Sequence, residues 1–94
     1  MPWTWDPVKN AENLAKHGVP FEIAQRVFDD DYCFTYDDPF TGESRFRSLG
    51  VIGPSMLIVI HTEEEPDPQT GERAGRIISA RRATRLERLI YEEK

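Results

Sequence analysis

The feature that most constrains the fold is a continuous apolar run at residues 56–60 (MLIVI), preceded by the turn signal Gly53-Pro54-Ser55. Five apolar residues are far too few to cross a bilayer as a helix. An unbroken apolar run of this length, bounded by turn signals, is typical of a strand that is covered on both faces. We therefore predict a central strand over residues 56–61.

The segments around this run have the patterns of further strands. Residues 32–36 (YCFTY) alternate with three aromatic side chains on one face, and residues 37–42 (DDPFTG) predict a turn, which includes Thr41-Gly42. We predict a return strand over 44–52, with Arg45 and Arg47 on one face and Phe46 on the other. Residues 76–80 would form the last strand. Residues 63–71 (EEEPDPQTG) are polar, with two prolines and one glycine, and we expect an exposed loop there.

Three segments have helix signals. Asp6 suits an N-cap, Pro7 the first helical position and Gly18 the C-terminal stop of a first helix. A second helix would run over 20–28, and Thr84 with Glu87 forms a capping box that opens a final helix. We expect the following residues to face inward: Val8, Ala11, Leu14 and Ala15 from the first helix, Phe21, Ala24, Val27 and Phe28 from the second, and Leu86, Leu89 and Ile90 from the last.

Together these patterns predict one α+β domain over residues 1–94. Two N-terminal helices would precede a four-stranded antiparallel sheet, and a C-terminal helix would follow it. The residues Trp3-Thr4-Trp5 before the first helix would add a short edge strand. With 94 residues, 38% hydrophobic and 31% charged, the chain has the composition of a soluble globular protein, which excludes the disordered and fibrous classes.

Charge is unevenly distributed along the chain. The net charge of −5 argues against a general nucleic-acid binder. Residues 72–88, however, hold six arginines and two glutamates, a local excess of four positive charges, while the acidic runs lie elsewhere. Such separation can concentrate an anionic ligand on one surface of an acidic protein.

Several kinds of site are excluded or unsupported. Cys33 is the only cysteine, which rules out an internal disulfide and a multi-cysteine zinc site. There is no glycine-rich phosphate loop and no nucleophile elbow. The spacing of His17 and His61 gives no support for a metal site, so we expect no cofactor. Residues 1–3 (MPW) begin no secretion signal, and we expect a cytoplasmic protein without membrane contact.

Arginine and histidine remain as candidate functional residues. Arg81 and Arg82 lie between the last strand and the final helix, where they would form either an anion site or a solvated connection paired with nearby acids. His17 ends the first helix and would cap it or transfer protons, and His61 would be a half-buried strand residue or a proton-transfer group. The aromatic residues of segment 32–36 would form part of the core or stack on bases.

Two histidines and several arginines suffice for RNA cleavage without a metal. One group removes the proton of the 2′-hydroxyl, another protonates the leaving 5′-oxygen, and guanidinium groups hold the charged phosphate. The hydroxyl of the RNA is itself the nucleophile, so no serine or cysteine is needed. The sequence is compatible with this chemistry, but the spacing of the residues does not demonstrate it.

Most of the chain resembles the BrnT family of toxins. The resemblance is carried by residues 5–7 (WDP), 16–18 (KHG), 27–30 (VFDD), 61–62 (HT) and, most specifically, 76–84 (RIISARRAT). It implies a fold similar to RelE-type toxins and a metal-independent endoribonuclease that cleaves mRNA and stops translation. It also implies neutralisation by a BrnA-type antitoxin with a ribbon-helix-helix part, through which alone the complex would bind operator DNA.

The resemblance also implies which residues form the site. Arg81 and Arg82 would clamp the scissile phosphate, and Arg47 would stabilise charge in the transition state. Either His17 or His61 would transfer protons. Further RNA contacts would come from Lys16, Arg45, Arg76 and Arg85. The alternative is a non-catalytic co-repressor that acts with a DNA-binding partner, which the net charge and the lack of a firm catalytic triad favour.

Overall fold

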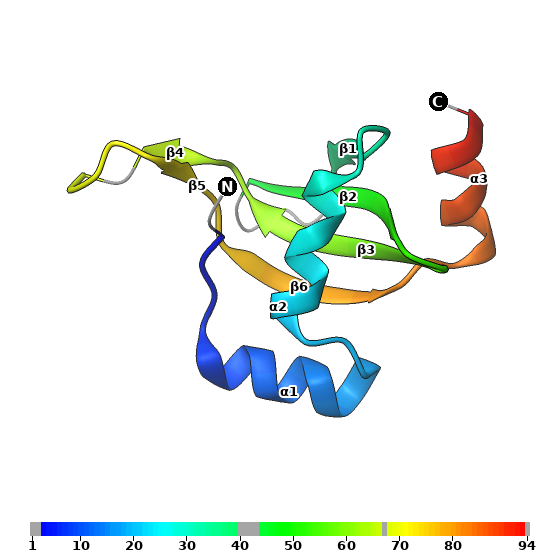
Figure 1. The fold of residues 1–94 in the computed structure, drawn as a ribbon, viewed down its shortest axis with the longest axis horizontal. Helices are drawn as coiled ribbons and strands as arrows, with labels where there is room; N and C mark the ends of the chain where they lie inside the picture. The colour runs from blue at the N-terminus through cyan, green and yellow to red at the C-terminus, as the bar shows by residue number, and fades with distance from the viewer. Residues whose placement is uncertain (1–2, 40–43, 67, 94) are drawn as a thin grey trace.

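Helices lie on both sides of a twisted antiparallel sheet in the computed structural model, which describes residues 3–39, 44–66 and 68–93 (Figure 1). The predicted residues Thr41-Gly42 lie outside this part of the chain. The elements are α1 (Pro7–His17), α2 (Phe21–Ala24), the 3₁₀ segment η1 (Gln25–Asp29), β1 (Phe34–Asp37), β2 (Arg45–Ile52), β3 (Ser55–Thr62), β4 (Glu65–Pro66), β5 (Arg73–Ala74), β6 (Ile77–Arg82) and α3 (Arg85–Glu93).

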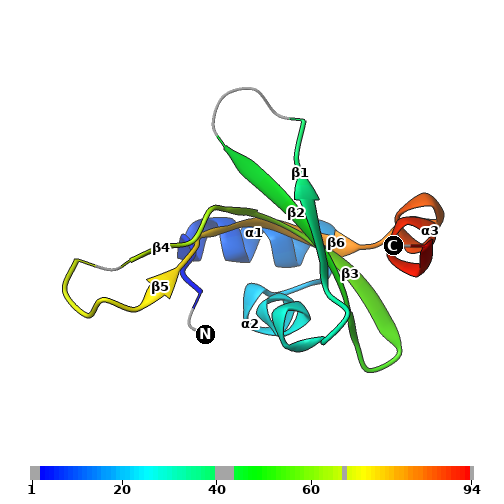
Figure 2. The same cartoon turned by 90° about the horizontal axis from the view of Figure 1, so that it is seen from above.

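The main sheet confirms the predicted α+β class. Its four strands are antiparallel in the order β1-β2-β3-β6, so the apolar run lies in β3, next to a strand on either side. The stretch 63–71 is not wholly a loop, because residues 65–66 (β4) pair with residues 73–74 (β5) in a small ribbon. This ribbon and α3 lie at opposite ends of the molecule (Figure 2).

One face of the sheet, here called the helix face, packs against α2 and η1. Phe21, Ala24 and Val27 are fully buried there, as the sequence predicted. Gly50 in β2 permits this packing, because a Cβ at this position would lie 2.7 Å from the carbonyl oxygen of Val27. The rest of this core is formed by Trp3, Val19, Leu57, Val59, Ile77 and Ala80.

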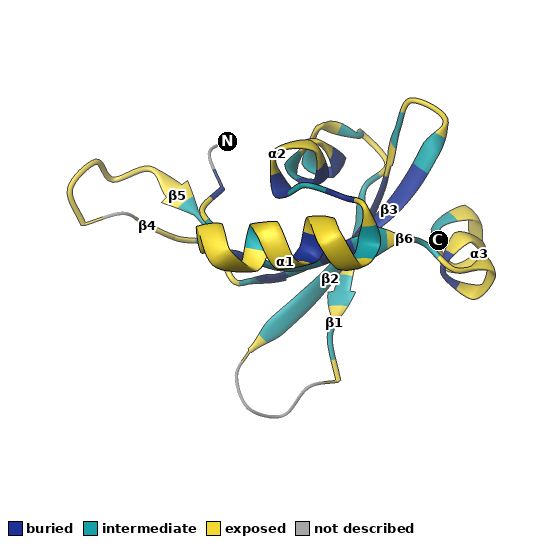
Figure 3. Cartoon of the chain, turned by 90° about the horizontal axis from the view of Figure 1, so that it is seen from below, coloured by how far each residue is buried: buried dark blue, intermediate teal, exposed yellow. Residues whose placement is uncertain are grey.

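Helix α1 lies along the edge strand β6 with its polar face inward, which reverses the prediction for this helix. Its caps are the expected ones, since Asp6 accepts a hydrogen bond from the Val8 amide and Gly18 has a φ of 72°. Val8 and Leu14, however, are 65% and 49% exposed. Figure 3 shows α1 as mostly exposed, with one buried position, which is Asn13.

Asn13 explains this orientation. Its side chain donates to the carbonyl oxygens of Val19 and Ala80, at 2.8 Å each, and accepts from the Ala80 amide at 3.2 Å. The two bonds to Ala80 satisfy backbone groups of β6 that have no further strand beside them, and α1 thereby covers the open edge of the sheet. The backbone hydrogen bonds of the edge strand therefore decide which side of α1 faces inward.

The N-terminal residues run beside β6 without forming a full strand. Thr4 makes an isolated parallel bridge with Arg76, where a short edge strand was predicted. Trp3 is 6% exposed and stacks on Phe28 with ring centroids 4.0 Å apart. This segment is thus anchored by Trp3 in the core of the helix face.

Helix α3 is held to the sheet by polar contacts. The predicted capping box is present, because the Thr84 amide donates to Glu87 and the Glu87 amide donates to the Thr84 hydroxyl. The Tyr91 hydroxyl donates to Asp30 at 2.7 Å. The prediction that the apolar residues of this helix face inward is wrong, because its apolar side is exposed, with 73% at Leu86, 43% at Leu89 and 40% at Ile90.

Candidate functional site

The second face of the sheet, here called the arginine face, carries two rows of side chains whose positions follow from the strand register. Residues opposite one another in an antiparallel pair project from the same face. The first row therefore contains Phe34, Leu49, Ile58 and Arg81, and the second contains Tyr36, Arg47, Ile60 and Ser79.

Arg47 and Arg81 converge on Glu87 at the start of α3. The two Nη atoms of Arg81 donate to the two carboxylate oxygens of Glu87 at 2.8 and 2.9 Å. The Nη1 atom of Arg47 lies 4.0 Å from Oε2 of the same carboxylate. On its other side, Arg47 donates through Nε to Asp38 at 2.6 Å. The result is a fixed pair of guanidinium groups that share one carboxylate.

These contacts keep the cluster ionised. The hydrogen bonds from Arg81 lower the pKa of Glu87, against the opposing effect of burial. The hydrogen bond to Glu87 raises the pKa of Arg81, and the hydrogen bond to Asp38 raises that of Arg47. Both arginines therefore remain cations at any pH at which the fold is stable.

Aromatic rings lie beside the arginine pair. Phe34 and Tyr36 stack with centroids 5.7 Å apart and are both half-buried. Tyr36 lies directly opposite Arg47 in the register of β1 and β2, so its ring projects from the same face as the Arg47 side chain. Tyr32, the third aromatic residue of the predicted alternation, lies outside the strand and is 69% exposed.

The arginine pair lies on the same face of the sheet as buried apolar residues and is itself partly exposed to solvent. Leu49 and Ile58, which lie in the first row of the same face, are fully buried. The side chains of Arg47 and Arg81 are 28% and 33% exposed. Guanidinium groups held in this way present planar sets of donors that match phosphate oxygens, and the adjacent rings offer a stacking surface for a base.

His61 lies on the other face of the sheet. It is 5% exposed, and its ring nitrogens are bonded to the Ser48 hydroxyl at 2.7 Å and to the Thr62 carbonyl at 2.8 Å. Because the carbonyl can only accept, Nδ1 carries the proton and Nε2 accepts from Ser48. Burial lowers the pKa of His61. The structure thus separates this histidine from the arginine pair by the thickness of the sheet.

Lys16 and His17 lie in the last turn of α1, where cations are stabilised by the helix dipole. They line a cavity of about 140 Å³ together with Asn13 and Ser79, along the edge of β6. His17 has no hydrogen bond, ion pair or ring contact with Arg47, Arg81 or Glu87 among the described residues. The structure therefore does not bring His17 into the arginine cluster.

The other predicted arginines are distributed around the sheet. Arg45 lies two residues before Arg47 on the same face, and it lines a cavity of about 130 Å³ with Lys9 and Arg76. Arg85 is exposed in the first turn of α3. Arg82 lies opposite Leu57 on the helix face, so that the adjacent Arg81 and Arg82 point to opposite sides of the sheet.

Sequence reasoning missed the acidic members of the cluster. Glu87 was identified only as a capping residue, although its place three residues after Thr84 also positions a carboxylate beside the end of the last strand. No sequence signal paired Asp38 with Arg47, because the two residues are joined only by the register of β1 and β2. Tyr36 was identified as an aromatic residue, but its position opposite Arg47 also depends on this register.

Two further observations describe the chain as a whole. Across residues 3–39, 44–66 and 68–93, no three histidine, cysteine, aspartate or glutamate side chains gather in a way that could hold a metal ion. Within the same ranges, no helix combines the length and the apolar character needed to cross a membrane.

Fold and site together define a small α+β protein in which two arginines share one carboxylate beside stacked aromatic rings. Comparison of the sequence with known protein families identifies one family. The family of BrnT ribonuclease toxins of type II toxin–antitoxin systems matches residues 5–87, and the chain belongs to this family. Membership implies an RNA target and an antitoxin partner. No curated protein matches the chain.

Proposed function

We propose that the chain is a metal-independent endoribonuclease that cleaves mRNA and thereby stops translation. The observation that carries the proposal is the convergence of Arg47 and Arg81 on Glu87, beside the rings of Phe34 and Tyr36. This arrangement offers two fixed cations to one phosphate group and a stacking surface to the adjacent base. The ribonuclease activity of the family is consistent with such a site.

The proposed reaction uses the RNA as its own nucleophile. The 2′-oxygen bonds to phosphorus as the bond from phosphorus to the 5′-oxygen breaks, which leaves a 2′,3′-cyclic phosphate and a 5′-hydroxyl. One proton leaves the 2′-oxygen and one is supplied to the 5′-oxygen. Arg47 and Arg81 would bind the non-bridging oxygens and stabilise the charge that develops on them, while Glu87 positions Arg81.

For the proton transfers, the geometry favours Tyr36 over His17 and His61. Tyr36 lies opposite Arg47 in the strand register, on the face that would hold the phosphate. His61 is buried on the helix face, and His17 lies on α1. We therefore propose that Tyr36 donates the proton to the leaving 5′-oxygen and that solvent water takes the proton of the 2′-oxygen. Lys16, Arg45, Arg76 and Arg85 would contact flanking RNA.

The proposal extends to the partners. The fold would be of the RelE type, and a BrnA-like antitoxin with a ribbon-helix-helix part would neutralise the toxin. Operator DNA would be bound only through that antitoxin, because the chain itself carries a net charge of −5. The site of action would be the cytoplasm, where mRNA is translated.

The test is cleavage of a labelled RNA by the purified protein in the presence of EDTA. Arg47→Ala and Arg81→Ala should each lower the rate constant at least 100-fold, the usual effect of removing one fixed donor to a developing oxyanion. Arg73→Ala removes an exposed arginine of β5 and should stay within a few-fold of the wild type. Tyr36→Phe should lower cleavage without abolishing RNA binding.

The alternatives give different results. Cleavage that appears only with an added divalent cation would contradict the metal-independent mechanism. A wild-type protein that neither cuts RNA nor arrests growth, but still binds the protein encoded beside its gene, would instead be the non-catalytic co-repressor. Cleavage unaffected by both arginine substitutions would place the site elsewhere.

A further inference from the structure

An apolar cavity lies on the helix-face side of the molecule, away from the arginine pair. It has a volume of about 220 Å³ and lies between the α1–α2 loop, α2, the end of the β2–β3 hairpin and the end of β6. The residues that matter here are Val19, Pro20, Ile23, Ile52, Leu57 and Arg82. Cavities that hold small-molecule ligands typically measure about 300–1,000 Å³, so this one suits a single protruding side chain better.

The wall of the cavity leaves apolar surface exposed. Ile23 is 41% exposed, although it lies in α2 between the buried Phe21 and Ala24. Ile52 is only partly buried at the end of β2, and Leu57 is 4% exposed. Exposed apolar side chains beside a small cavity are typical of a surface that another protein covers.

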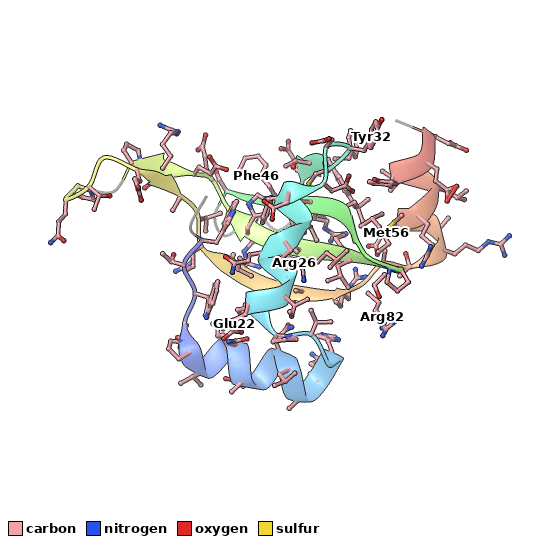
Figure 4. All side chains as sticks on the ribbon, viewed as in Figure 1. Glu22, Arg26, Tyr32, Phe46, Met56 and Arg82 are labelled. Atoms are coloured by element: carbon pink, nitrogen blue, oxygen red, sulfur yellow. The ribbon has the colours of Figure 1, made fainter. Side chains whose placement is uncertain are left out.

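One arginine lines the cavity, and a second lies just beyond the helical wall that Ile23 forms. Arg82 lies opposite Leu57 in the strand register and is exposed, and Figure 4 shows it below the sheet, on the side of α1 and α2. Arg26 follows Ile23 by three residues in the next helical turn and is also exposed. Neither side chain forms an ion pair with another described residue. On a chain with a net charge of −5, these cations make the surface complementary to acidic side chains.

We propose that this cavity is the docking site for the antitoxin, and that it takes one apolar side chain of an acidic amphipathic segment. The segment would place the apolar side chain against Ile23 and Ile52 and its carboxylates beside Arg26 and Arg82. The inference rests on the proposed function, because the partner is the antitoxin that the family implies. Arginine and a buried apolar anchor are the usual centres of binding energy in such interfaces.

The position of the cavity makes the inference separable from the catalytic proposal. Arg81 and Arg82 are neighbours in the chain but lie on opposite faces of the sheet, one beside Glu87 and one beside the cavity. Substitutions around the cavity should therefore weaken antitoxin binding without changing the cleavage of RNA, and substitutions at the arginine pair should have the reverse effect.

The experiment measures the affinity of the purified toxin for the protein encoded beside its gene, by titration calorimetry. Ile23→Asp and Arg82→Glu should each raise the Kd at least tenfold, and Arg26→Glu should raise it by less. Arg73→Glu makes the same change in charge at an exposed site remote from the cavity and should leave the Kd within twofold. Thermal melting checks that each variant is folded. Because Arg26 and Arg82 are exposed, we expect their two variants to fold like the wild type.

Activity separates the two proposals. Ile23→Asp and Arg26→Glu should cleave RNA at the wild-type rate in the absence of the partner and should resist neutralisation in growing cells. Wild-type affinity in both Ile23→Asp and Arg82→Glu would overturn the docking site while leaving the ribonuclease proposal intact. A wild type without ribonuclease activity would overturn the proposed function, while the affinities would still test the docking site. A dimer of the free protein that Ile23→Asp dissociates would show that a second copy covers the cavity, which also overturns the inference.

Discussion

Replacing Glu87 by glutamine should destabilise the protein and loosen the proposed catalytic arginine pair, because both effects depend on the same contacts. The carboxylate accepts two hydrogen bonds from Arg81, at 2.8 and 2.9 Å, and one from the Thr84 amide at 2.8 Å. Glutamine keeps the size of the side chain but offers a single acceptor oxygen and no charge. At least one hydrogen bond from Arg81 is lost. In the contacts that remain, the acceptor is a neutral amide in place of a carboxylate.

The size of the effect follows from the exposure of the partners. A hydrogen bond between charged groups contributes about 1.5–3 kcal/mol, and breaking a fully buried ion pair costs about 3–5 kcal/mol. The Arg81 side chain is 33% exposed, so water partly compensates it. We therefore expect a loss of about 2 kcal/mol in the free energy of unfolding, which for a domain of this size corresponds to a fall of about 10 °C in Tm.

The dependence on pH tests the cause of this loss. The pKa of Glu87 is lowered from its ordinary value of 4.5 in the folded state, so its contribution is fully present above that value and is lost as the pH falls through the native pKa. Urea denaturation should show the difference between wild type and Glu87→Gln at pH 7, and a smaller difference at pH 3.5. Glu92→Gln, on the exposed side of the same helix, is the matched control. An equal difference at both pH values, or none at pH 7, would refute the reasoning.

Two further substitutions test the open edge and the helix face of the sheet. Asn13→Leu removes the buried partner of the edge backbone of β6. Because each unsatisfied buried group costs about 1–3 kcal/mol, urea denaturation should show a loss of about 3 kcal/mol in the free energy of unfolding. A free energy of unfolding within about 1 kcal/mol of the wild type would show that water replaces these bonds. His61→Gln should lower Tm, because it disturbs a buried hydrogen bond to Ser48, but the rate of RNA cleavage should stay within a few-fold of the wild-type rate. A loss of cleavage of about 100-fold in a folded variant would instead assign His61 to the reaction.

The elements of the fold with local signals were predictable from the sequence. Asp6, Gly18 and the capping box at Thr84 act at the helix ends where their chemistry places them. The apolar run predicted a central strand, and β3 has a strand on either side. The alternation of Arg45 and Arg47 with Phe46 gave the correct faces of β2. In each case the signal is contained in a short stretch of neighbouring residues.

The candidate site was only partly predictable, because it depends on register. The last strand was predicted to end at residue 80, which left Arg81 and Arg82 as one connection with a shared direction. Strand β6 continues through residue 82, so the twofold alternation of a strand separates the two side chains. The meeting of Arg47 with Arg81 in turn requires two strand pairings and the placement of α3, none of which has a local signal.

In α1 and α3 the apolar side chains face solvent because the polar side chains of each helix occupy the side that packs against the sheet. A nine-residue or eleven-residue helix buries one side at most, and both helices have polar side chains that bond to groups of the sheet. For α1 the partner is the edge backbone at Ala80, and for α3 it is the guanidinium of Arg81. Leaving such a group unpaired costs about as much as burying a small apolar side chain gains, and Asn13 satisfies two of them at once. The polar side therefore faces inward in both helices. Because the same polar contacts set the position of Glu87, the orientation that exposes the apolar residues of α3 also brings the carboxylate to the arginine pair.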